Sequence, residues 1–293
     1  MAQIEQYLIS LDRYQVVSKI GSGGFGNVLL IEDKSTKEKF VAKISHMDDE
    51  DSRERDLNAI KLMGELQHPN IVKFVGYSPV DFNGDNHLTM IFSYASNGSL
   101  SNVIKSNKID NTTRQIILVG ICGGMKYLHG KNIMHRDLKP DNILIDGDFH
   151  PQITDFILYA KYEEGKEFDI VGTPIYMAPE VAKNDNKYDM SIDVYSFAIV
   201  MFQLLTGSDK PYDLSKIKNK FTFIKSIISG LRPEFNVPVK EPLQTLIKQC
   251  WSEKPSDRLT FEQLFQKLAY EPEYYLDDVD AGKVKSYADS INH

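Results

Sequence analysis

Hydrophobic and polar residues follow two different patterns along this chain, one typical of strands and one typical of helices. Across residues 14–92, short runs of β-branched and aromatic residues such as YQVVSKI and KFVAKIS predict strands, and one segment with helical spacing, 53–66, interrupts them. Beyond residue 98, apolar residues recur at helical spacing, as in IILVGICGGMKYLHG and SIDVYSFAIVMFQLLTG. The pattern predicts an α+β protein in which a small, mostly β lobe precedes a larger, mostly α lobe.

Changes in composition set the boundaries between these parts. The polar, glycine-containing stretch 93–98 separates the strand-like pattern from the helix-like pattern. We therefore expect it to be the hinge between an N-lobe, 14–92, and a C-lobe, 99–270. Residues 1–13 then form an N-terminal extension, and residues 271–293 form an acidic C-terminal tail.

Composition and charge narrow the class of protein. The chain has 293 residues, of which 42% are hydrophobic and 26% charged, as in an ordinary globular protein. The net charge of −7 and the lack of a long basic run argue against binding nucleic acid through bulk electrostatics. Cys122 and Cys250 lie far apart and outside any metal-binding pattern, which predicts reduced thiols in a cytoplasmic protein. No signal peptide is evident, and the most apolar stretch, 194–205, is too short to span a membrane.

A glycine-rich segment lies between two apolar runs near the N-terminus. It contains Gly21, Gly23 and Gly26 in the pattern G-x-G-x-x-G, which occurs in dinucleotide-binding folds, in protein kinases and in plain hairpin turns. In a dinucleotide-binding fold the pattern opens a helix, whereas here Val28 and the residues after it continue as a strand. A hairpin of this kind can fold over phosphates, so the continuation favours the kinase interpretation.

Lys43 lies in the next predicted strand, seventeen positions beyond Gly26. A lone lysine in a strand is usually a solvated charge. At this distance after the glycines, however, its ammonium group would lie under the hairpin and neutralise the α- and β-phosphates of a nucleotide.

The most specific motif is HRDLKPDN, residues 135–142. It resembles the protein kinase catalytic loop H-R-D-L-x-x-x-N at every specified position. The resemblance implies that Asp137 accepts the proton of the substrate hydroxyl, that Asn142 binds magnesium, and that Lys139 stabilises the transferring phosphoryl group. A lysine two residues after the aspartate also resembles the serine/threonine class rather than the tyrosine class.

Two further motifs follow at the spacing of the same family. Asp155, which begins an Asp-Phe pair, matches the second magnesium-binding residue. The segment GTPIYMAPE, residues 172–180, resembles the substrate-docking region, and its Thr173 again resembles the serine/threonine class. In the family Glu180 pairs with a buried arginine, and Arg258 matches that arginine.

The resemblance covers residues 14–270, and the wording D-V-Y-S-F and C-W-x-x-x-P-x-x-R is similar to the tyrosine-kinase-like branch. It implies the two-lobed kinase fold, ATP and Mg²⁺ as cofactors, and a protein substrate with serine or threonine. It also implies that the adenine hydrogen-bonds to the hinge backbone and is enclosed by apolar side chains, with a bulky gatekeeper behind them. The matching residues are Ser93 and Ala95 for the hinge, Ile20, Val28 and Ala42 for the apolar contacts, and Phe92 for the gatekeeper.

The sequence departs from the family pattern at two positions that matter for activity. Ile157 replaces the glycine of D-F-G, and a β-branched residue resists the positive φ that glycine tolerates, so we expect one loop conformation to be favoured. Ala59 stands nine positions before His68, where the family has the helix glutamate that pairs with the strand lysine. Asp56, one turn earlier, either replaces that glutamate in part or is, like Glu54, a solvated helix charge.

The predicted activation loop contains no serine or threonine between residues 157 and 171. Asp169 occupies a position that is often phosphorylated in the family, and its carboxylate could pair with Arg136 without modification. The alternative is that Asp169 belongs to an acidic, solvated loop with its glutamate neighbours.

Two functional classes follow from these patterns. An enzyme that transfers the γ-phosphoryl group of Mg-ATP to a protein serine or threonine is favoured by Asp137 and Asn142. A pseudokinase, which binds nucleotide or partners without catalysis, is favoured by Ala59 and Ile157. A small-molecule kinase is disfavoured by the intact docking region 172–180. No pattern indicates the substrate, the upstream regulator or the oligomeric state.

Overall fold

A computed structural model describes residues 4–23, 26–45, 50–215, 217 and 219–292. These residues form two compact units. Unit 1 comprises the described residues of 1–67 and 71–96, and unit 2 comprises 68–70 and the described residues of 97–293. Unit 1 is mostly β and unit 2 mostly α, which confirms the predicted two-lobed α+β fold.

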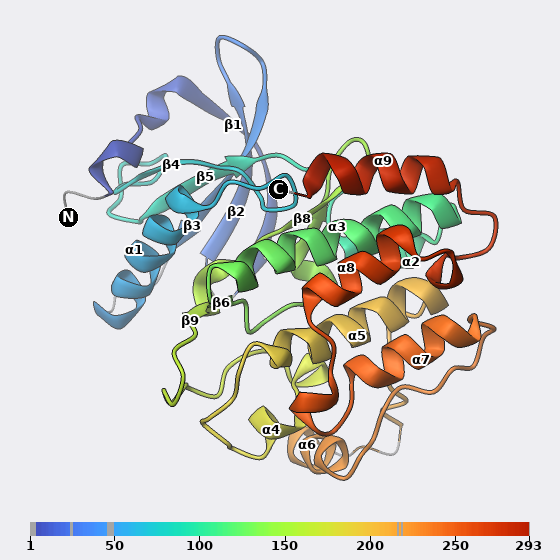
Figure 1. The fold of residues 1–293 in the computed structure, drawn as a ribbon. Coiled ribbons are helices and arrows are strands. Elements are labelled where there is room, and N and C mark those ends of the chain that lie inside the picture. The colour runs from blue at the N-terminus through green and yellow to red at the C-terminus, as the bar shows by residue number, and fades with distance from the viewer. Residues whose placement is uncertain (1–3, 24–25, 46–49, 216, 218, 293) are drawn as a thin grey trace. The chain divides into compact units, whose positions relative to one another are not determined.

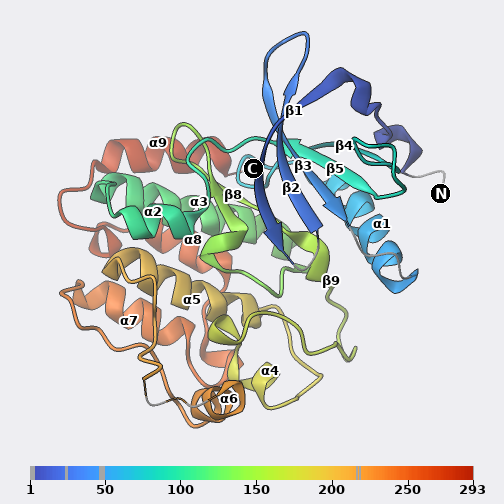
Figure 2. The same ribbon diagram turned by 180° about the vertical axis from the view of Figure 1, so that it is seen from behind.

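Unit 1 is built on a five-stranded antiparallel sheet with strand order β1-β2-β3-β5-β4 (Figures 1 and 2). The strands are β1 (Tyr14–Gly23), β2 (Gly26–Asp33), β3 (Lys39–Ser45), β4 (Phe74–Ser78) and β5 (Thr89–Ser93). Two short 3₁₀ segments precede the sheet, η1 (Glu5–Tyr7) and η2 (Leu11–Arg13).

Helix α1 (Glu50–Glu65) and the two faces of the sheet form the hydrophobic interior of unit 1. On one face Ile60 of α1 packs with Tyr77 and Met90. The second cluster comprises Tyr14, Ile31, Phe40, Ala42 and Ile91. Alternation along a strand sends consecutive side chains to opposite faces, which explains why β5 contributes Met90 to one cluster and Ile91 to the other.

Unit 2 consists of helices packed around α5 (Ser191–Thr206), which is buried along nearly its whole length. Such a helix is apolar on all sides because it forms the centre of the unit. The other helices are α2 (Leu100–Ser106), α3 (Asn111–Gly130), α4 (Pro179–Ala182), α6 (Lys220–Ile228), α7 (Glu241–Cys250), α8 (Phe261–Tyr270) and α9 (Ala281–Ile291).

Two small antiparallel sheets in unit 2 support the loops between its helices. Strand β6 (Ile133–Met134) pairs with β9 (Ala160–Lys161), and β7 (Ile143–Ile145) pairs with β8 (Pro151–Ile153). Short 3₁₀ segments complete these loops: η3 (Pro140–Asn142), η4 (Phe156–Leu158), η5 (Pro174–Tyr176), η6 (Pro255–Asp257) and η7 (Pro272–Tyr274).

Residues 271–293 include a helix that the sequence analysis did not predict. Helix α9 packs along α3 and α8, as Figure 1 shows. It buries Val284, Tyr287, Ala288 and Ile291, while its lysines and Asp289 are exposed. The acidic tail therefore contains an amphipathic helix whose apolar face packs against the core of unit 2.

Cys122 and Cys250 are both buried and free. Burial raises the pKa of the Cys122 thiol well above its ordinary value and raises that of Cys250 to about 12. Within the described part of the chain, no helix combines the length and the apolar character needed to span a membrane.

Candidate active site

The predicted catalytic loop lies in unit 2 between β6 and β7, and its centre is the carboxylate of Asp137. This side chain is only 8% exposed. Lys139 Nζ donates to its Oδ2 at 2.6 Å, and Asn142 Nδ2 donates to the same oxygen at 3.1 Å. The other oxygen, Oδ1, accepts from the backbone N–H of Thr173 at 2.9 Å and from its hydroxyl at 2.7 Å. Four donors thus fix the orientation of one carboxylate.

Thr173 reaches Asp137 because the residue before it is a glycine. Gly172 has a φ of +106°, and a Cβ atom at this position would lie 2.5 Å from the carbonyl oxygen of Arg136. Only glycine combines this backbone angle with so close an approach. Lys139 Nζ also donates to Thr173 Oγ1 at 2.8 Å, so the three side chains form a closed triangle.

A backbone hydrogen bond connects Asn142 to the residue before Asp155: the N–H of Thr154 donates to the carbonyl of Asn142 at 3.0 Å. Asn142 Nδ2 also donates to the Asp137 carbonyl at 2.9 Å. The side-chain oxygen of Asn142, Oδ1, is therefore the atom that can coordinate a cation. One amide oxygen and one carboxylate are hard donors of the kind that Mg²⁺ prefers, so the residues present fit this ion.

The backbone of the catalytic loop is held by Asp193, a fully buried carboxylate at the start of α5. Its oxygens accept from the N–H groups of His135 and Arg136, both at 2.9 Å, and lie 3.0 Å from His129 Nε2. Burial alone would raise the pKa of Asp193, but the hydrogen bond and the charges of His129 and His135 outweigh it and hold the pKa below its ordinary value.

The Asp-Phe-Ile segment adopts one defined conformation in the structure. Asp155 has φ 67° and ψ 62°, in the left-handed region, and Phe156 begins the 3₁₀ segment η4. The Phe156 ring is 3% exposed and lies 5.3 Å from the ring of His135. Ile157 lies within η4 and is not among the described residues with positive φ. The unusual backbone angle therefore falls on an aspartate, which tolerates it, and the β-branched Ile157 bears no such strain here.

Asp169 does not form the predicted ion pair with Arg136. The Arg136 guanidinium instead donates to the carbonyl oxygens of Leu158 and Tyr159 and to the hydroxyl of Tyr188. Tyr188 in turn donates to the backbone carbonyl of Asp169 at 2.6 Å. The Asp169 side chain is exposed, and it forms no ion pair with another described residue. A buried tyrosine, which the sequence pattern did not single out, occupies the space between the two residues.

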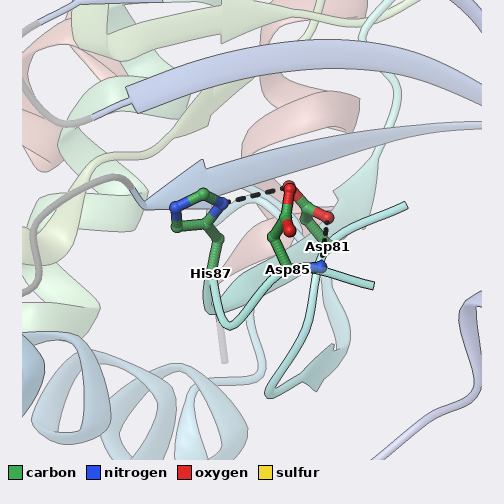
Figure 3. A group of neighbouring side chains, drawn as sticks. All are labelled: Asp81, Asp85 and His87. Atoms are coloured by element: carbon green, nitrogen blue, oxygen red, sulfur yellow. Dashed lines mark hydrogen bonds and ion pairs between the residues drawn. The ribbon is translucent and has the colours of Figure 1, made fainter. Parts of the chain in front are cut away.

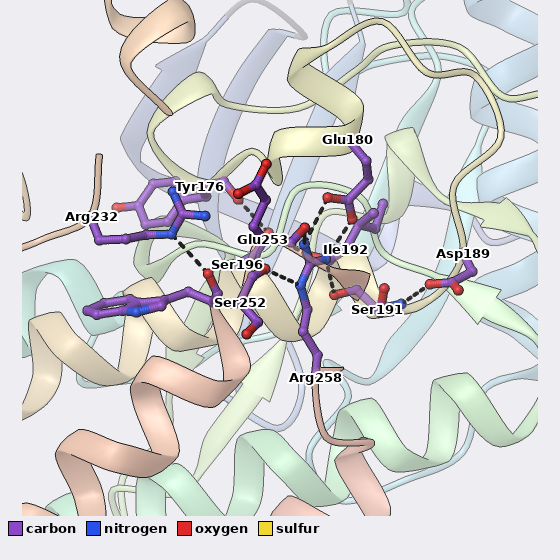
Figure 4. Close-up of polar contacts among 11 residues, drawn as sticks. Tyr176, Glu180, Asp189, Ser191, Ile192, Ser196, Arg232, Ser252, Glu253 and Arg258 are labelled. Carbon is purple, nitrogen blue, oxygen red and sulfur yellow. Dashed lines mark hydrogen bonds and ion pairs between the residues drawn. The ribbon is translucent and has the colours of Figure 1, made fainter. Parts of the chain in front are cut away.

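The predicted pair of Glu180 and Arg258 is confirmed (Figure 4). Two guanidinium nitrogens of Arg258 donate to the two carboxylate oxygens of Glu180, at 2.6 and 2.8 Å. The same guanidinium also donates to backbone carbonyls of Ser191 and Ser252, at 3.2 and 3.0 Å. This buried, bidentate pair ties the docking segment to α5 and to the loop before η6.

In unit 1, the strand register places Gly21 opposite Val28, Val28 opposite Lys43 and Lys43 opposite Met90. Side chains that face each other across antiparallel strands project from the same face of a sheet. Val28 and Lys43 therefore share the face on which Met90 packs. Gly23 and Gly26 pair at the end of the hairpin, and the two residues between them lie outside the described part of the chain.

Ala42 does not lie on the face that we expected for a nucleotide contact. It is fully buried in the second core cluster, with Phe40 and Ile91, because it is adjacent to Lys43 in the strand and projects the opposite way. Val41, two residues before Lys43, takes the expected face.

The other residues of unit 1 that we predicted to contact a nucleotide lie in β1, in β5 and just after β5. Ile20 is 49% exposed, and the Phe92 ring lies 5.7 Å from that of Phe74. The N–H of Ser93 donates to the carbonyl oxygen of Lys73, so the backbone N–H of Ser93 is not available to an adenine. Ala95 is buried, and among the described residues no backbone acceptor takes its N–H.

Asp56 lies on the inner side of α1 and is only 6% exposed, whereas Glu54 is exposed. Burial raises the pKa of the Asp56 carboxyl, and a hydrogen bond with Ser45 and the charge of Lys43 partly offset this effect. Of the two interpretations from the sequence, the solvated charge is wrong for Asp56. Ala59 is buried as well but carries no charge. Asp56 is therefore the acidic side chain that α1 presents toward β3.

Comparison with known proteins identifies the family. The model of the protein kinase domain matches residues 14–268. The chain belongs to the protein kinase domain family. It is 33% identical over 273 residues to a "probable serine/threonine-protein kinase" of Dictyostelium discoideum, which covers 89% of this chain and 20% of that protein. It is 37% identical over 204 residues to serine/threonine-protein kinase CLA4 of Candida albicans, over 68% of this chain and 20% of that protein.

A third relative is cAMP-dependent protein kinase type 3 of Saccharomyces cerevisiae, which is 29% identical over 255 residues, or 84% of this chain and 61% of that protein. The chain spans about a fifth of the length of the first two relatives. The branch of the kinase family to which it belongs stays a prediction.

Two groups of contacts in this kinase domain were not predicted from the sequence. The contacts of Thr173 and Asp193 with the catalytic loop join residues that are 36 and 57 positions apart, so no local pattern reports them. The other group is Asp81, Asp85 and His87, between β4 and β5, whose ligand atoms lie within 4.8 Å of one another (Figure 3). Asp81 already accepts from the N–H groups of Asn83 and Asp85 and contacts His87, so these bonds account for the group as a loop-stabilising turn.

Proposed function

We propose that this kinase domain transfers the γ-phosphoryl group of Mg-ATP to a serine or threonine of a protein substrate. The observation that carries the proposal is the Asp137 carboxylate, which is held at both oxygens by Lys139, Asn142 and Thr173. A carboxylate fixed in this way is suited to accept a proton from a hydroxyl that attacks phosphorus.

Each residue of the loop has a distinct part in the proposed step. Asp137 orients the substrate hydroxyl and takes its proton as the oxygen bonds to the γ-phosphorus, while the bond from that phosphorus to the β–γ bridging oxygen breaks and ADP leaves. Lys139, 2.6 Å from Asp137, places a positive charge where negative charge develops on the transferring group. Asn142 and Asp155 would hold magnesium, which would supply positive charge to neutralise the phosphate groups.

Unit 1 would hold the nucleotide itself. Lys43 is proposed to bind the α- and β-phosphates, with Gly21, Gly23 and Gly26 in the hairpin that covers them. Asp56 is proposed to orient Lys43 in place of the family glutamate, because it is buried and its charge interacts with that lysine. The proposed contacts of the adenine are Ile20, Val28, Val41, Phe92, the carbonyl of Ser93 and the N–H of Ala95.

The preference for serine and threonine rests on Thr173 and Lys139. Their mutual bond of 2.8 Å combines two features that resemble the serine/threonine class. Two of the three relatives named above also carry serine/threonine-protein kinase in their names. We further propose that the protein acts in cytoplasmic signalling, where ATP is abundant and buried thiols such as Cys122 and Cys250 stay reduced.

Two findings weigh against a scaffold without catalysis. The buried Asp56 supplies an acidic partner for Lys43 although residue 59 is an alanine. Ile157 sits in a helical turn that places no positive φ on it.

The experiment is transfer of labelled γ-phosphate from Mg-ATP to a generic protein substrate, followed by phosphoamino acid analysis. We expect phosphoserine or phosphothreonine with the wild type, and none with Asp137→Asn or when EDTA removes magnesium. A folded wild type that binds ATP without transferring phosphate would refute the proposal and favour the scaffold alternative.

A further inference from the structure

Unit 2 contains an open cavity that the proposed reaction does not use. It has a volume of about 1040 Å³ and lies between the end of α5, the loop that follows it, α6 and the segment after α6. This volume is at the upper end of the range for ligand pockets, so the cavity can accept several side chains of a bound molecule. Its apolar lining comes from Phe202, Tyr212, Leu214, Leu231 and Val237.

Exposed apolar side chains gather around this cavity. Leu214 and Val237 line it and are 46% and 42% exposed. Phe221, the second residue of α6, is 78% exposed. One wall is firmly packed, because Tyr212 is buried and its ring meets that of Phe223 edge-on, with centroids 5.1 Å apart. Apolar residues that cluster on a surface mark an interaction site, whereas singly scattered ones are normal.

Arg232 also lines the cavity, and no carboxylate matches its charge. Its Nε donates to the carbonyl of Trp251 at 2.9 Å (Figure 4). Its Nη1 donates to the carbonyls of Ile227 and Leu231, at 3.2 and 2.8 Å, and the guanidinium lies over the ring of Tyr195. Among the described residues, Nη2 has no acceptor and Arg232 has no ion pair. The guanidinium is therefore held in one orientation, ready to bind a carboxylate of a ligand.

The surrounding segment is positively charged as well. Residues 208–234 include five lysines and one arginine but only two aspartates and one glutamate, in a chain with a net charge of −7. Asp213 and Glu234 line the cavity too, but both are exposed to water, which screens their charges, whereas Arg232 is partly buried. The region therefore complements a ligand that combines carboxylates with bulky apolar groups.

Within unit 2 the cavity is connected to the docking segment 172–180. The hydroxyl of Tyr176 donates to Gln203 Oε1 at 3.0 Å, and Gln203 Nε2 donates to the carbonyl of Asp209, in the loop that lines the cavity, at 3.1 Å. Helix α4 packs against α6 (Figures 1 and 2). A protein that presents a serine or threonine to Asp137 can therefore reach the cavity with another part of its chain.

We propose that this cavity is a docking site for a protein substrate. The substrate inserts an acidic segment with bulky apolar side chains, separate from the segment that carries the phosphorylated serine or threonine. The apolar side chains bind between Leu214 and Val237, and a carboxylate pairs with Nη2 of Arg232. This inference rests on the proposed function. Two contacts joined by one chain raise the effective concentration of the acceptor, so docking should lower the KM with little effect on kcat.

The first test measures binding without catalysis. The probe is a library of short random peptides that contain aspartate, glutamate, leucine and phenylalanine but no serine, threonine or tyrosine. A matched library has lysine in place of the acidic residues. We expect the full chain to select peptides from the acidic library alone.

Variants then locate the bound peptides. Leu214→Asp should weaken their binding about tenfold or more. Leu8→Asp should bind them like the wild type, since Leu8 is similarly exposed, at 53%, but belongs to unit 1. If no acidic peptide is selected, or if Leu214→Asp binds as tightly as the wild type, the proposal is overturned.

Two further variants test the role of charge. Arg232→Gln should weaken binding about tenfold or more, and urea unfolding checks that this variant, which loses backbone contacts, still folds. Lys210 is exposed and lines the cavity, so Lys210→Glu should keep the fold and weaken binding about twofold to fivefold. Unchanged binding in both variants would contradict recognition of an acidic segment.

The second test measures kinetics with a selected peptide. A short acceptor peptide with one serine is compared with the same acceptor joined to the selected peptide by a flexible glycine-serine linker. We expect the joined substrate to have the lower KM and a similar kcat, and the ratio of the two KM values to return to about one in Leu214→Asp but not in Leu8→Asp. Equal KM values with the wild type would refute the docking role. If the wild type phosphorylates neither substrate, the proposed function fails, and peptide binding alone decides whether the cavity is a docking site.

Two other occupants would give different results. Binding to phosphatidylserine vesicles that Leu214→Asp abolishes, without binding of acidic peptides, would replace the proposal by a membrane contact. A dimer in sedimentation experiments that Leu214→Asp dissociates, again without peptide binding, would replace it by a contact between two copies of the chain.

Discussion

Replacing Glu180 by alanine should destabilise this kinase domain strongly, because it leaves a buried guanidinium without its counter-charge. The Arg258 side chain is fully buried and that of Glu180 is 12% exposed, with a shortest contact of 2.6 Å. Removing one partner of a buried ion pair costs about 3–5 kcal/mol, and the slight exposure of Glu180 favours the lower end of this range. For a unit of about 200 residues, 3 kcal/mol corresponds to a fall in Tm of roughly 6–12 °C.

The assay is calorimetry or urea unfolding of Glu180→Ala beside Lys183→Ala. Lys183 forms an exposed ion pair with Glu253 at 3.1 Å, with side-chain exposures of 44% and 63%. Such a surface pair contributes about 0–1 kcal/mol, so the control should shift the free energy of unfolding by no more than that. If the two variants lost equal stability, or if Glu180→Ala cost less than about 1 kcal/mol, the assignment of Glu180 and Arg258 as a buried structural pair would be wrong.

Three further predictions concern single side chains. Because burial raises the pKa of Asp56, the folded state favours the protonated form of this carboxyl. The wild type should therefore lose stability relative to Asp56→Asn as pH rises from about 4 through the folded pKa. Urea unfolding should show a difference in free energy of unfolding between the two proteins at about pH 7 but not at about pH 4. Since burial raises the pKa of both Cys122 and Cys250, a thiol reagent at pH 8 should modify neither in the folded protein and both in urea; rapid reaction of the folded form would contradict their burial. Ile157→Gly should lower the free energy of unfolding by about 0.4–1 kcal/mol and speed amide exchange around Phe156, because glycine increases the freedom of the unfolded chain and of this turn. Unchanged exchange would show that Ile157 does not restrict the segment.

The sequence allowed prediction of those parts of the site that lie close together in the chain. Asp137, Lys139 and Asn142 fall within six residues, so their spacing nearly determines their geometry. The pairing of Glu180 with Arg258, 78 positions apart, was predicted only through the family resemblance. Their carboxylate and guanidinium nevertheless meet as expected.

Contacts that depend on tertiary packing could not be predicted in the same way. Whether Asp56 is solvated depends on how α1 packs against the sheet, and the sequence left both interpretations open. The face of Ala42 follows from strand alternation, yet the motif match alone gave the wrong assignment. Tyr188 separates Arg136 from Asp169 because the chain brings it there from a distant loop. We did not predict helix α9 because the acidic residues before it, in 271–280, are typical of a solvated tail.

The central claim is that this domain transfers phosphate with Asp56 in the role of the family's helix glutamate. The most direct test is to measure the rate of phosphate transfer by the Asp56→Asn variant. The wild type and Asp51→Asn, which changes an exposed carboxylate on the same helix, serve as references. We predict transfer by the wild type, a similar rate with Asp51→Asn, and a fall on the order of 10²-fold with Asp56→Asn, as for loss of one preorganised electrostatic contact. An unchanged rate with Asp56→Asn, or no transfer by the folded wild type, would contradict this mechanism.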